Sequence, residues 1–246
     1  MRVLSVNFNN INMTTALEQA LSLLEENKKS RIFFLNADCL YRAQNDDEYR
    51  YILNTADLVL PDGVGLRLIV KWLGSKLAGN CNGTDFSPLF LARTTQKGYK
   101  VFFLGGRLGT AEKAAENLRR KIPEIRIVGT HSGYLDNETE VINKINHSGA
   151  DILFVAMGVP IQEKWINRNL DKLNPRLCLG VGGLFDYIAG NVKRAPKIIR
   201  IIQLEWLWRI AMEPKRLWRR YLVDDIKLFR AVIKQKYGNG NNKEKK

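Results

Sequence analysis

One carboxylate, Asp62, stands out as a group that could take part in catalysis. It lies between Pro61 and Gly63, directly after the short apolar run Leu58–Leu60. If that run is a buried strand, the carboxylate follows its end with little conformational freedom, where it could accept a proton from a substrate hydroxyl. The alternative is structural: an Asx-turn, or the N-cap of a helix that begins near Val64.

A glycine-rich segment, Gly105-Gly106-Arg107-Leu108-Gly109, offers a second possibility, anion binding. Glycines between a strand and a helix let free backbone amides and the helix dipole face a phosphate, and Gly105 and Gly106 suit that role. Such glycines are equally common where a chain only turns tightly. The Walker lysine and the full G-x-G-x-x-G spacing are both missing, so the two interpretations stay open on the residues alone.

Further polar and glycine residues occur in loops that follow other apolar runs. In open α/β sheets, ligands bind beyond the carboxyl ends of the strands, so these loops would line one rim of the protein. Gln162, Glu163 and Asp186 are nevertheless as compatible with structural roles as with ligand binding. The candidate residues of these loops are Asn36, Tyr134, Gly158, Gln162, Glu163 and Asp186.

The sequence predicts no metal site and no cofactor. Asp-x-Asp, with which sugar-nucleotide enzymes often hold a divalent cation, does not occur, and Asp46-Asp47-Glu48 instead fits the first turn of a helix. The three cysteines follow no metal-ligand spacing and indicate a reducing compartment. His131 and His147 are far apart in the sequence and show no nucleophile-base context. We therefore predict metal-independent chemistry.

The elements that must position these residues follow an α/β pattern, which predicts a Rossmann-like, mainly parallel sheet flanked by helices. Thr15 and Glu18 suggest a capping box in front of the first helix. Helices are predicted over 16–26, 109–123, 136–146 and 160–173. Buried strands are predicted over 3–8, 31–36, 58–60, 100–104, 125–129, 152–156 and 177–181.

Charge divides the chain into two parts. The 246 residues carry a net charge of +14; residues 193–246 hold 16 Lys plus Arg against 5 Asp plus Glu, and the first 192 hold 23 against 20. We predict an α/β catalytic domain over 1–192 and a basic helical appendage over 193–246, with a disordered tail from about 238. We expect neither a signal peptide nor a membrane span, because no apolar run is long enough.

The appendage is predicted to contain two helices. Pro196 and Pro214 each suit a first turn, giving 196–212 and 214–236. In the second helix, apolar residues recur at three- and four-residue spacing opposite a row of Lys and Arg. Such a helix can lie on an anionic membrane surface, or it can dock on the protein with its basic face in water. Nucleic acid is not expected as a partner, because no recognised nucleic-acid motif accompanies the charge.

Ordered motifs spread over nearly the whole chain identify a family. They are Leu35–Asp38, Ala56–Gly65, Gly83-Thr84-Asp85, Phe103–Gly106, Met157–Glu163, Gly182–Asp186, Arg194-Ala195-Pro196, Leu204–Arg209 and Glu213–Arg216. In the order and the residues of these motifs, the chain resembles the WecG/TagA/CpsF-type bacterial glycosyltransferases. That family includes the teichoic-acid linkage N-acetylmannosaminyltransferase and the N-acetylmannosaminuronic acid transferase of enterobacterial common antigen.

The resemblance implies an activity. Members transfer a sugar from a UDP-sugar to the 4-hydroxyl of N-acetylglucosamine on undecaprenyl diphosphate, with inversion, for cell-surface polysaccharide or teichoic acid. They are cytoplasmic and peripheral on the inner face of the cell membrane. Apart from the resemblance, a surface that packs with its own appendage and with neighbours on a membrane could support a homo-oligomer. A membrane-tethered nucleotide-sugar-binding protein without turnover is one alternative. Another is a hexosyltransferase of exopolysaccharide assembly with a different lipid-linked acceptor.

The resemblance also implies residue roles. Asp62 falls at the general base, Asn36 and Gln162 at ligands of the sugars, and Tyr134 and Asp186 at contacts of the uracil-ribose portion. Cations for the lipid diphosphate fall at Arg209, Arg216 and Arg219.

Two positions depart from the pattern of many relatives. Phe34 replaces a threonine, and Asn80 replaces an arginine three residues before Gly83-Thr84-Asp85. Both positions border the predicted pocket. We therefore expect them to change which donor sugar fits, and N-acetylmannosamine is not carried over as the donor.

Overall fold

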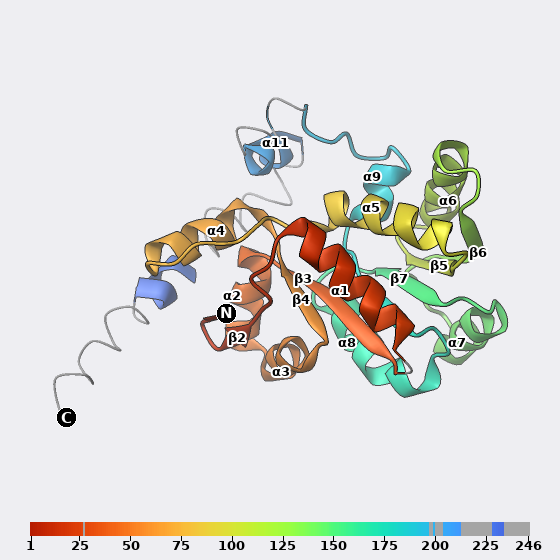
Figure 1. Cartoon of the computed structure of the whole chain (residues 1–246), viewed down its shortest axis with the longest axis horizontal. Helices are drawn as coiled ribbons and strands as arrows, with labels where there is room; N and C mark the ends of the chain where they lie inside the picture. Colours follow the sequence, from red (N-terminus) through yellow and green to blue (C-terminus); the bar gives the residue numbers. More distant parts are fainter. Residues whose placement is uncertain (27, 197–198, 200–203, 213–227, 234–246) are drawn as a thin grey trace.

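A parallel sheet forms the centre of the computed structural model, which describes residues 1–26, 28–196, 199, 204–212 and 228–233 (Figure 1). The strand order in this six-stranded sheet is β4-β3-β8-β7-β5-β6, and every neighbouring pair is parallel. This confirms the predicted α/β class. The strands are β3 (Ser30–Leu35), β4 (Leu58–Pro61), β5 (Lys100–Gly105), β6 (Arg126–His131), β7 (Ile152–Ala156) and β8 (Leu177–Gly180).

Helices cover both faces of the sheet, so each strand alternates between two cores. Phe33 and Leu35 belong to the first core, whereas Ile32 and Phe34 belong to the second. The helices on the first face are α2 (Ala37–Asn45), α3 (Asp47–Thr55), α4 (Gly63–Trp72), α7 (Glu138–His147) and α8 (Ile161–Asn169). Those on the second face are α1 (Met13–Glu25), α5 (Gly83–Gln96), α6 (Thr110–Lys121) and α9 (Leu184–Ile188).

The predicted helix starts are partly right. Asp46 is the N-cap of α3, which confirms the acidic first turn. The capping box at Thr15 is wrong, because α1 begins earlier: the side chain of Asn12 accepts a hydrogen bond of 3.0 Å from the Thr15 amide. Asparagine is a strong N-cap in its own right. The predicted helix over 160–173 ends as α8 at Asn169 and continues as the 3₁₀ turn Leu170–Lys172.

The first predicted strand, residues 3–8, is wrong because the chain reverses within it. Leu4 and Ser5 have φ of 46° and 68°, and they join β1 (Arg2–Val3) to β2 (Val6–Asn7) in a separate antiparallel pair. This hairpin leads to the free edge of β4. There Asn9 bonds to Val59 with both its backbone amide (2.8 Å) and its side-chain oxygen (2.9 Å). The edge strand is thereby protected from pairing with another chain.

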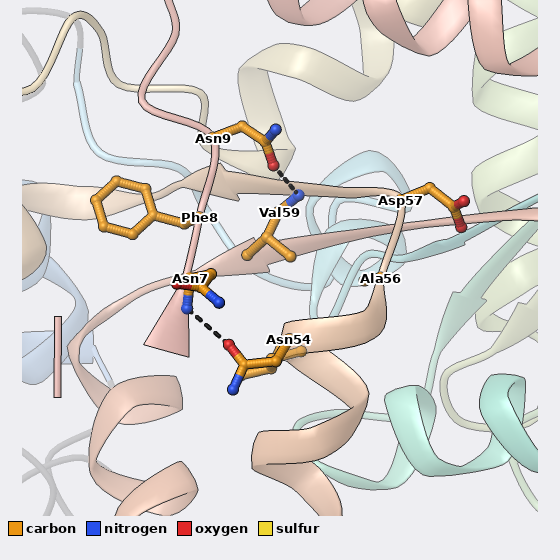
Figure 2. Close-up of a pocket in the computed structure, with 8 residues that line it drawn as sticks. Asn7, Phe8, Asn9, Asn54, Ala56, Asp57 and Val59 are labelled. Atoms are coloured by element: carbon orange, nitrogen blue, oxygen red, sulfur yellow. Dashed lines mark hydrogen bonds between the residues drawn. The ribbon is translucent and has the colours of Figure 1, made fainter. Parts of the chain in front are cut away.

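A shallow hollow lies where the hairpin meets β4 and α3, and its polar groups serve that attachment (Figure 2). Asn54 accepts from the Asn7 amide at 2.8 Å, and its own amide donates to the Ser5 carbonyl at 2.9 Å. We assign the hollow a structural role.

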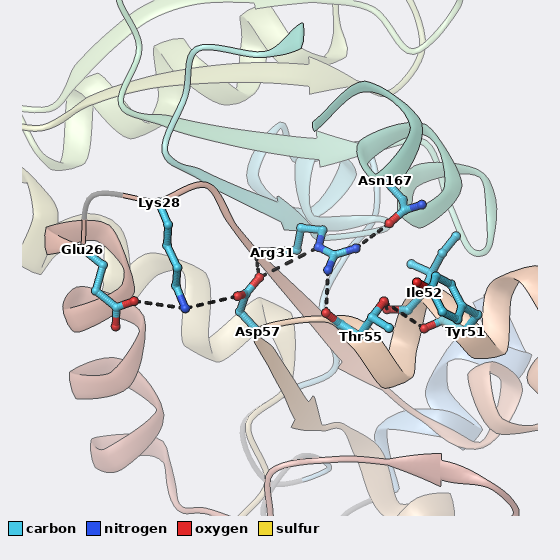
Figure 3. A network of polar contacts seen from close by, with 8 residues as sticks. All are labelled: Glu26, Lys28, Arg31, Tyr51, Ile52, Thr55, Asp57 and Asn167. Carbon is cyan, nitrogen blue, oxygen red and sulfur yellow. Dashed lines mark hydrogen bonds and ion pairs between the residues drawn. The ribbon is translucent and has the colours of Figure 1, made fainter. Parts of the chain in front are cut away.

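A polar network joins the amino ends of β3 and β4, opposite the end where ligands bind in such sheets (Figure 3). Asp57 accepts a 2.8 Å hydrogen bond from the Arg31 amide and lies 3.6 Å from the Lys28 ammonium. The Arg31 guanidinium also bonds to the side chain of Asn167 on α8 and to the carbonyl of Thr55 at the end of α3. These contacts link two strands and two helices, which indicates a stabilising role.

Two described segments belong to the C-terminal part of the chain. One is α11 (Glu205–Met212). It confirms the end of the helix predicted over 196–212 but not its start, because residues 196 and 204 are not helical. The other, residues 228–233, is helical and lies beside α4 (Figure 1). It buries Leu228 and Val232 in the first core and leaves Ile233 exposed. The division into domains at residue 192 stays a prediction. None of the helices in the described ranges is long and apolar enough to cross a membrane.

Candidate active site

The carboxyl ends of the strands bring the predicted loops to one rim. After β5 the chain enters α6 on the second face, and after β7 it enters α8 on the first. This divergence between neighbouring strands is a topological switch point, where open α/β sheets bind ligands. In strand order, the rim carries Asp62 after β4, Asn36 after β3, Gly182 after β8, Gly158 after β7 and Gly105-Gly106 at the end of β5.

The turn that carries Asp62 is fixed through its backbone. The Asp62 amide donates to the Leu35 carbonyl, and the Cys81 amide donates to the Pro61 carbonyl, both at 2.8 Å. Asp62 occupies the N-cap position of α4, yet its side chain makes no capping hydrogen bond. The N-cap alternative is therefore correct for its position in the chain, while the general-base role of its carboxylate stays a prediction.

Burial raises the pKa of the Cys81 thiol to about 11, and the negative charge of Asp62 adds to this effect. The Cys81 thiol is therefore neutral near pH 7 and is no competing nucleophile.

Asn36 lies beside Asp62 on the rim, because Leu35 precedes it and bonds to the Asp62 amide. Its side-chain oxygen caps α2 by accepting a 3.0 Å hydrogen bond from the Cys39 amide. The residue is partly exposed. Asn36 thus has a structural role as the N-cap of α2. Its predicted contact with a sugar of the substrates stays a prediction.

The glycines at the end of β5 are required by close packing. Gly105 has φ of 139°, and a Cβ there would lie 2.4 Å from the Ala156 carbonyl oxygen. Gly106 has φ of 73°, and its amide donates to the same oxygen at 2.8 Å. Close packing and positive φ therefore require both glycines, and their predicted contact with a phosphate is not tested by this geometry. Because the Gly106 amide is already engaged, any phosphate contact here must use the following amides, towards the N-terminus of α6.

Gln162 and Glu163 are buried beneath the rim, with exposed fractions of 2% and 1%. The Gln162 side chain accepts from the Gly182 amide at 2.9 Å and donates to the Glu163 carboxyl at 2.8 Å. It therefore ties the first turn of α8 to the loop after β8. Burial raises the pKa of Glu163 to about 7. In this conformation both residues support the rim from below, and their predicted contacts with substrate stay untested.

The two residues predicted at the uracil-ribose portion lie near the glycine turn. The Tyr134 side chain is 66% exposed, and its loop is held by a 2.8 Å hydrogen bond from the Gly133 amide to the Gly106 carbonyl. Asp186 lies in the first turn of α9, where the Asn191 amide group donates to it and to the Thr110 hydroxyl, each at 3.4 Å. Both loops thus reach the start of α6.

The predicted cationic residues are only partly placed. Arg209 belongs to α11, whereas Arg216 and Arg219 lie outside the described residues. Within the part of the chain that the structure describes, no group of His, Cys, Asp and Glu side chains is arranged to hold a metal ion.

Sequence reasoning missed what the two departing positions do. The Asn80 side chain accepts a 2.8 Å hydrogen bond from the Gly63 amide, next to Asp62. Phe34 is 7% exposed and packs edge-on against Phe86, with ring centroids 5.6 Å apart. Asn80 therefore fixes the Asp62 turn and Phe34 supports the start of α5. The only sequence signal was their departure from the family pattern.

Comparison with known proteins identifies the family. The model of the glycosyl transferase WecG/TagA/CpsF family matches residues 1–242. An N-acetylglucosaminyldiphosphoundecaprenol N-acetyl-beta-D-mannosaminyltransferase of Bacillus spizizenii is 36% identical over 199 residues, which cover 81% of this chain and 77% of the relative. The protein of the same name from Bacillus subtilis (strain 168) is 30% identical over 188 residues, covering 76% and 73%. The chain therefore belongs to the WecG/TagA/CpsF family of glycosyltransferases.

Proposed function

We propose that this enzyme transfers a sugar from a UDP-sugar to the 4-hydroxyl of N-acetylglucosamine carried on undecaprenyl diphosphate, with inversion at the anomeric carbon. The acceptor follows the printed names of both relatives. The observation that carries the proposal is the Asp62 turn, whose backbone is bonded to β3 and to the segment before α5, so that Asp62 is held at the carboxyl end of β4. N-acetylmannosamine, its uronic acid and glucose are the candidate donor sugars.

In the proposed reaction Asp62 removes the proton from the acceptor hydroxyl as its oxygen attacks C1 of the donor sugar. The bond between C1 and the diphosphate breaks, and UDP leaves with the electron pair. An α-linked donor thus gives a β-linked product. The start of α6 faces the developing negative charge, and arginines of the appendage supply positive charge, so that the reaction proceeds without a divalent cation.

The lipid acceptor would place the enzyme at the inner surface of the cell membrane. The net charge of residues 193–246, 16 − 5 = +11, favours an anionic surface. Arginine is suited to bind the lipid diphosphate, because its planar guanidinium forms paired hydrogen bonds to phosphate oxygens.

The test is UDP release from a panel of UDP-sugars, with and without a short-chain polyprenyl-diphosphate N-acetylglucosamine, in detergent and EDTA. We expect release that depends on the acceptor and on one preferred donor. Release only after Mg²⁺ is added would contradict the metal-independent mechanism. A folded protein that binds UDP but releases none from any donor would support the binding protein without turnover instead.

Asp62→Asn tests the general base in the same assay. The amide cannot accept the proton, so turnover should fall by about 100-fold or more, while UDP binding stays near that of the wild type. Asp171→Asn is the matched control, because Asp171 is exposed and lies before the amino end of β8, away from the rim. Near-normal turnover of Asp62→Asn would remove Asp62 from the role.

A further inference from the structure

Three motifs that are far apart in the sequence meet at one ion-pair cluster. Arg194 lies two residues after the predicted end of the α/β body at residue 192. Asp85 lies in the first turn of α5, and Glu205 is the first residue of α11. The Arg194 Nη2 lies 2.7 Å from Asp85 Oδ1, and its Nε lies 3.5 Å from Glu205 Oε1. We call these three residues the Arg194 cluster. It connects the start of the appendage to the body.

The contacts of the cluster are partly shielded from water. The side chains of Arg194 and Glu205 are 26% and 25% exposed and that of Asp85 is 42% exposed. The Arg194 nitrogens that face the carboxylates and the Glu205 oxygen are buried, and their contacts are ion pairs without hydrogen-bond geometry. Removing one member of a shielded ion pair leaves the other charge uncompensated, which is costly. A second contact acts on the same helix, because the Trp208 indole donates to the Lys193 carbonyl at 3.3 Å. The position of α11 therefore depends on residues 193 and 194.

The cluster is also joined to the Asp62 turn. The Asn82 side chain accepts from the Asp85 amide at 2.9 Å and donates to the Asp85 carboxylate at 2.7 Å, which holds that carboxylate in place. The adjacent residues, Cys81 and Asn80, are the ones that bond to the chain on either side of Asp62. One short segment, residues 80–85, thus contacts the two neighbours of the proposed base at one end and the appendage at the other.

We propose that Arg194 is a positioning residue that holds α11 beside the Asp62 corner of the rim, so that the appendage can bind the lipid-linked acceptor. The assignment to the acceptor rests on the proposed function, because α11 contains Arg209, one of the predicted cations for the lipid diphosphate. The predicted contacts of the UDP portion, at Gly105, Gly106, Tyr134 and Asp186, lie around the carboxyl end of β5, in a different part of the rim. Loss of the contacts in the Arg194 cluster should therefore weaken acceptor binding and leave donor binding unchanged.

Point substitutions test this better than removal of the appendage. A chain ending near Val192 would also lose Leu228 and Val232, which are buried in the first core. We would compare Arg194→Gln, Glu205→Gln, the double variant and Arg194→Lys in the full-length protein. Arg120→Gln is the matched control, since it removes one exposed arginine from α6.

The first measurement is hydrogen exchange of the backbone amides of residues 205–212, which needs no activity. We expect at least about tenfold faster exchange in Arg194→Gln and Glu205→Gln, no further increase in the double variant, and partial recovery in Arg194→Lys. If exchange in Arg194→Gln equals that of the wild type, the Arg194 cluster does not hold α11 in place and the proposal is overturned. This result would hold whether or not the protein transfers sugar.

The second measurement separates the KM values for the two substrates. If the docked fraction of α11 falls to about a tenth, the KM for the short-chain lipid acceptor should rise about tenfold, with the KM for the donor and the Kd of UDP unchanged. Faster exchange with an unchanged acceptor KM would show that the cluster only stabilises the fold, and would overturn the positioning role. If the wild type transfers no sugar, the proposed function fails, while the exchange data still show whether the Arg194 cluster holds α11.

Discussion

The buried carboxyl of Glu163 gives a quantitative prediction. Burial, opposed by the hydrogen bond from Gln162, raises its pKa to about 7, against 4.5 for a solvated glutamate. Between these two pH values the unfolded chain releases the proton while the folded protein keeps it. The folded state then binds more protons, so the free energy of unfolding falls as the pH rises and becomes constant above about pH 7.

The size of the effect follows from the two pKa values. Their difference, 7 − 4.5, multiplied by about 1.4 kcal/mol per pH unit, gives about 3 to 4 kcal/mol in all. Neighbouring groups do not obscure it, because the pKa of Cys39 is raised to about 12 and that of Tyr49 well above its ordinary value, both by burial. Neither side chain titrates between pH 5 and pH 8.

Glu163→Gln isolates this contribution. Its side-chain oxygen can still accept from Gln162, and any change in packing shifts stability equally at all pH values. We would measure urea unfolding of variant and wild type from pH 5 to pH 8. The stability of the variant relative to the wild type should rise by about 2 to 3 kcal/mol over this range. Glu116→Gln, at an exposed site on α6, is the control and should show no such rise. A pH-independent difference for Glu163→Gln would refute the reasoning.

Two substitutions test other parts of the structure. Gly105→Ala should destabilise the protein by at least about 2 kcal/mol and weaken UDP binding, because its Cβ would lie 2.4 Å from the Ala156 oxygen. Calorimetry measures the loss of stability, and UDP titration measures the loss of binding. A variant as stable as the wild type would contradict the packing described at Gly105. Leu228→Ala should cost about 2–4 kcal/mol in urea unfolding, since Leu228 is buried in the first core. Ile233→Ala, at an exposed position of the same segment, should cost much less, and equal costs would show that the segment does not pack as described.

The strands of the parallel sheet could be predicted from the sequence. Six of the seven expected strands correspond to β3–β8, because short apolar runs bounded by loops are a local signal. The seventh failed at Leu4 and Ser5, where two non-glycine residues adopt positive φ, which their types do not favour. The helix α5 was not predicted, because its Pro88 and its weak apolar periodicity hide it.

The positions of the candidate site residues along the chain could be predicted from the sequence, but most of their tertiary contacts could not. The position of Asp62 after a strand, the glycines at the end of β5 and the basic C-terminal part all follow from the printed sequence, because each depends on neighbouring residues. Only the tertiary structure decided that Gln162 and Glu163 lie beneath the rim, and that Arg194 meets Asp85 and Glu205. Burial and ion pairing of this kind depend on which elements pack together, and residue type and spacing along the chain do not encode that.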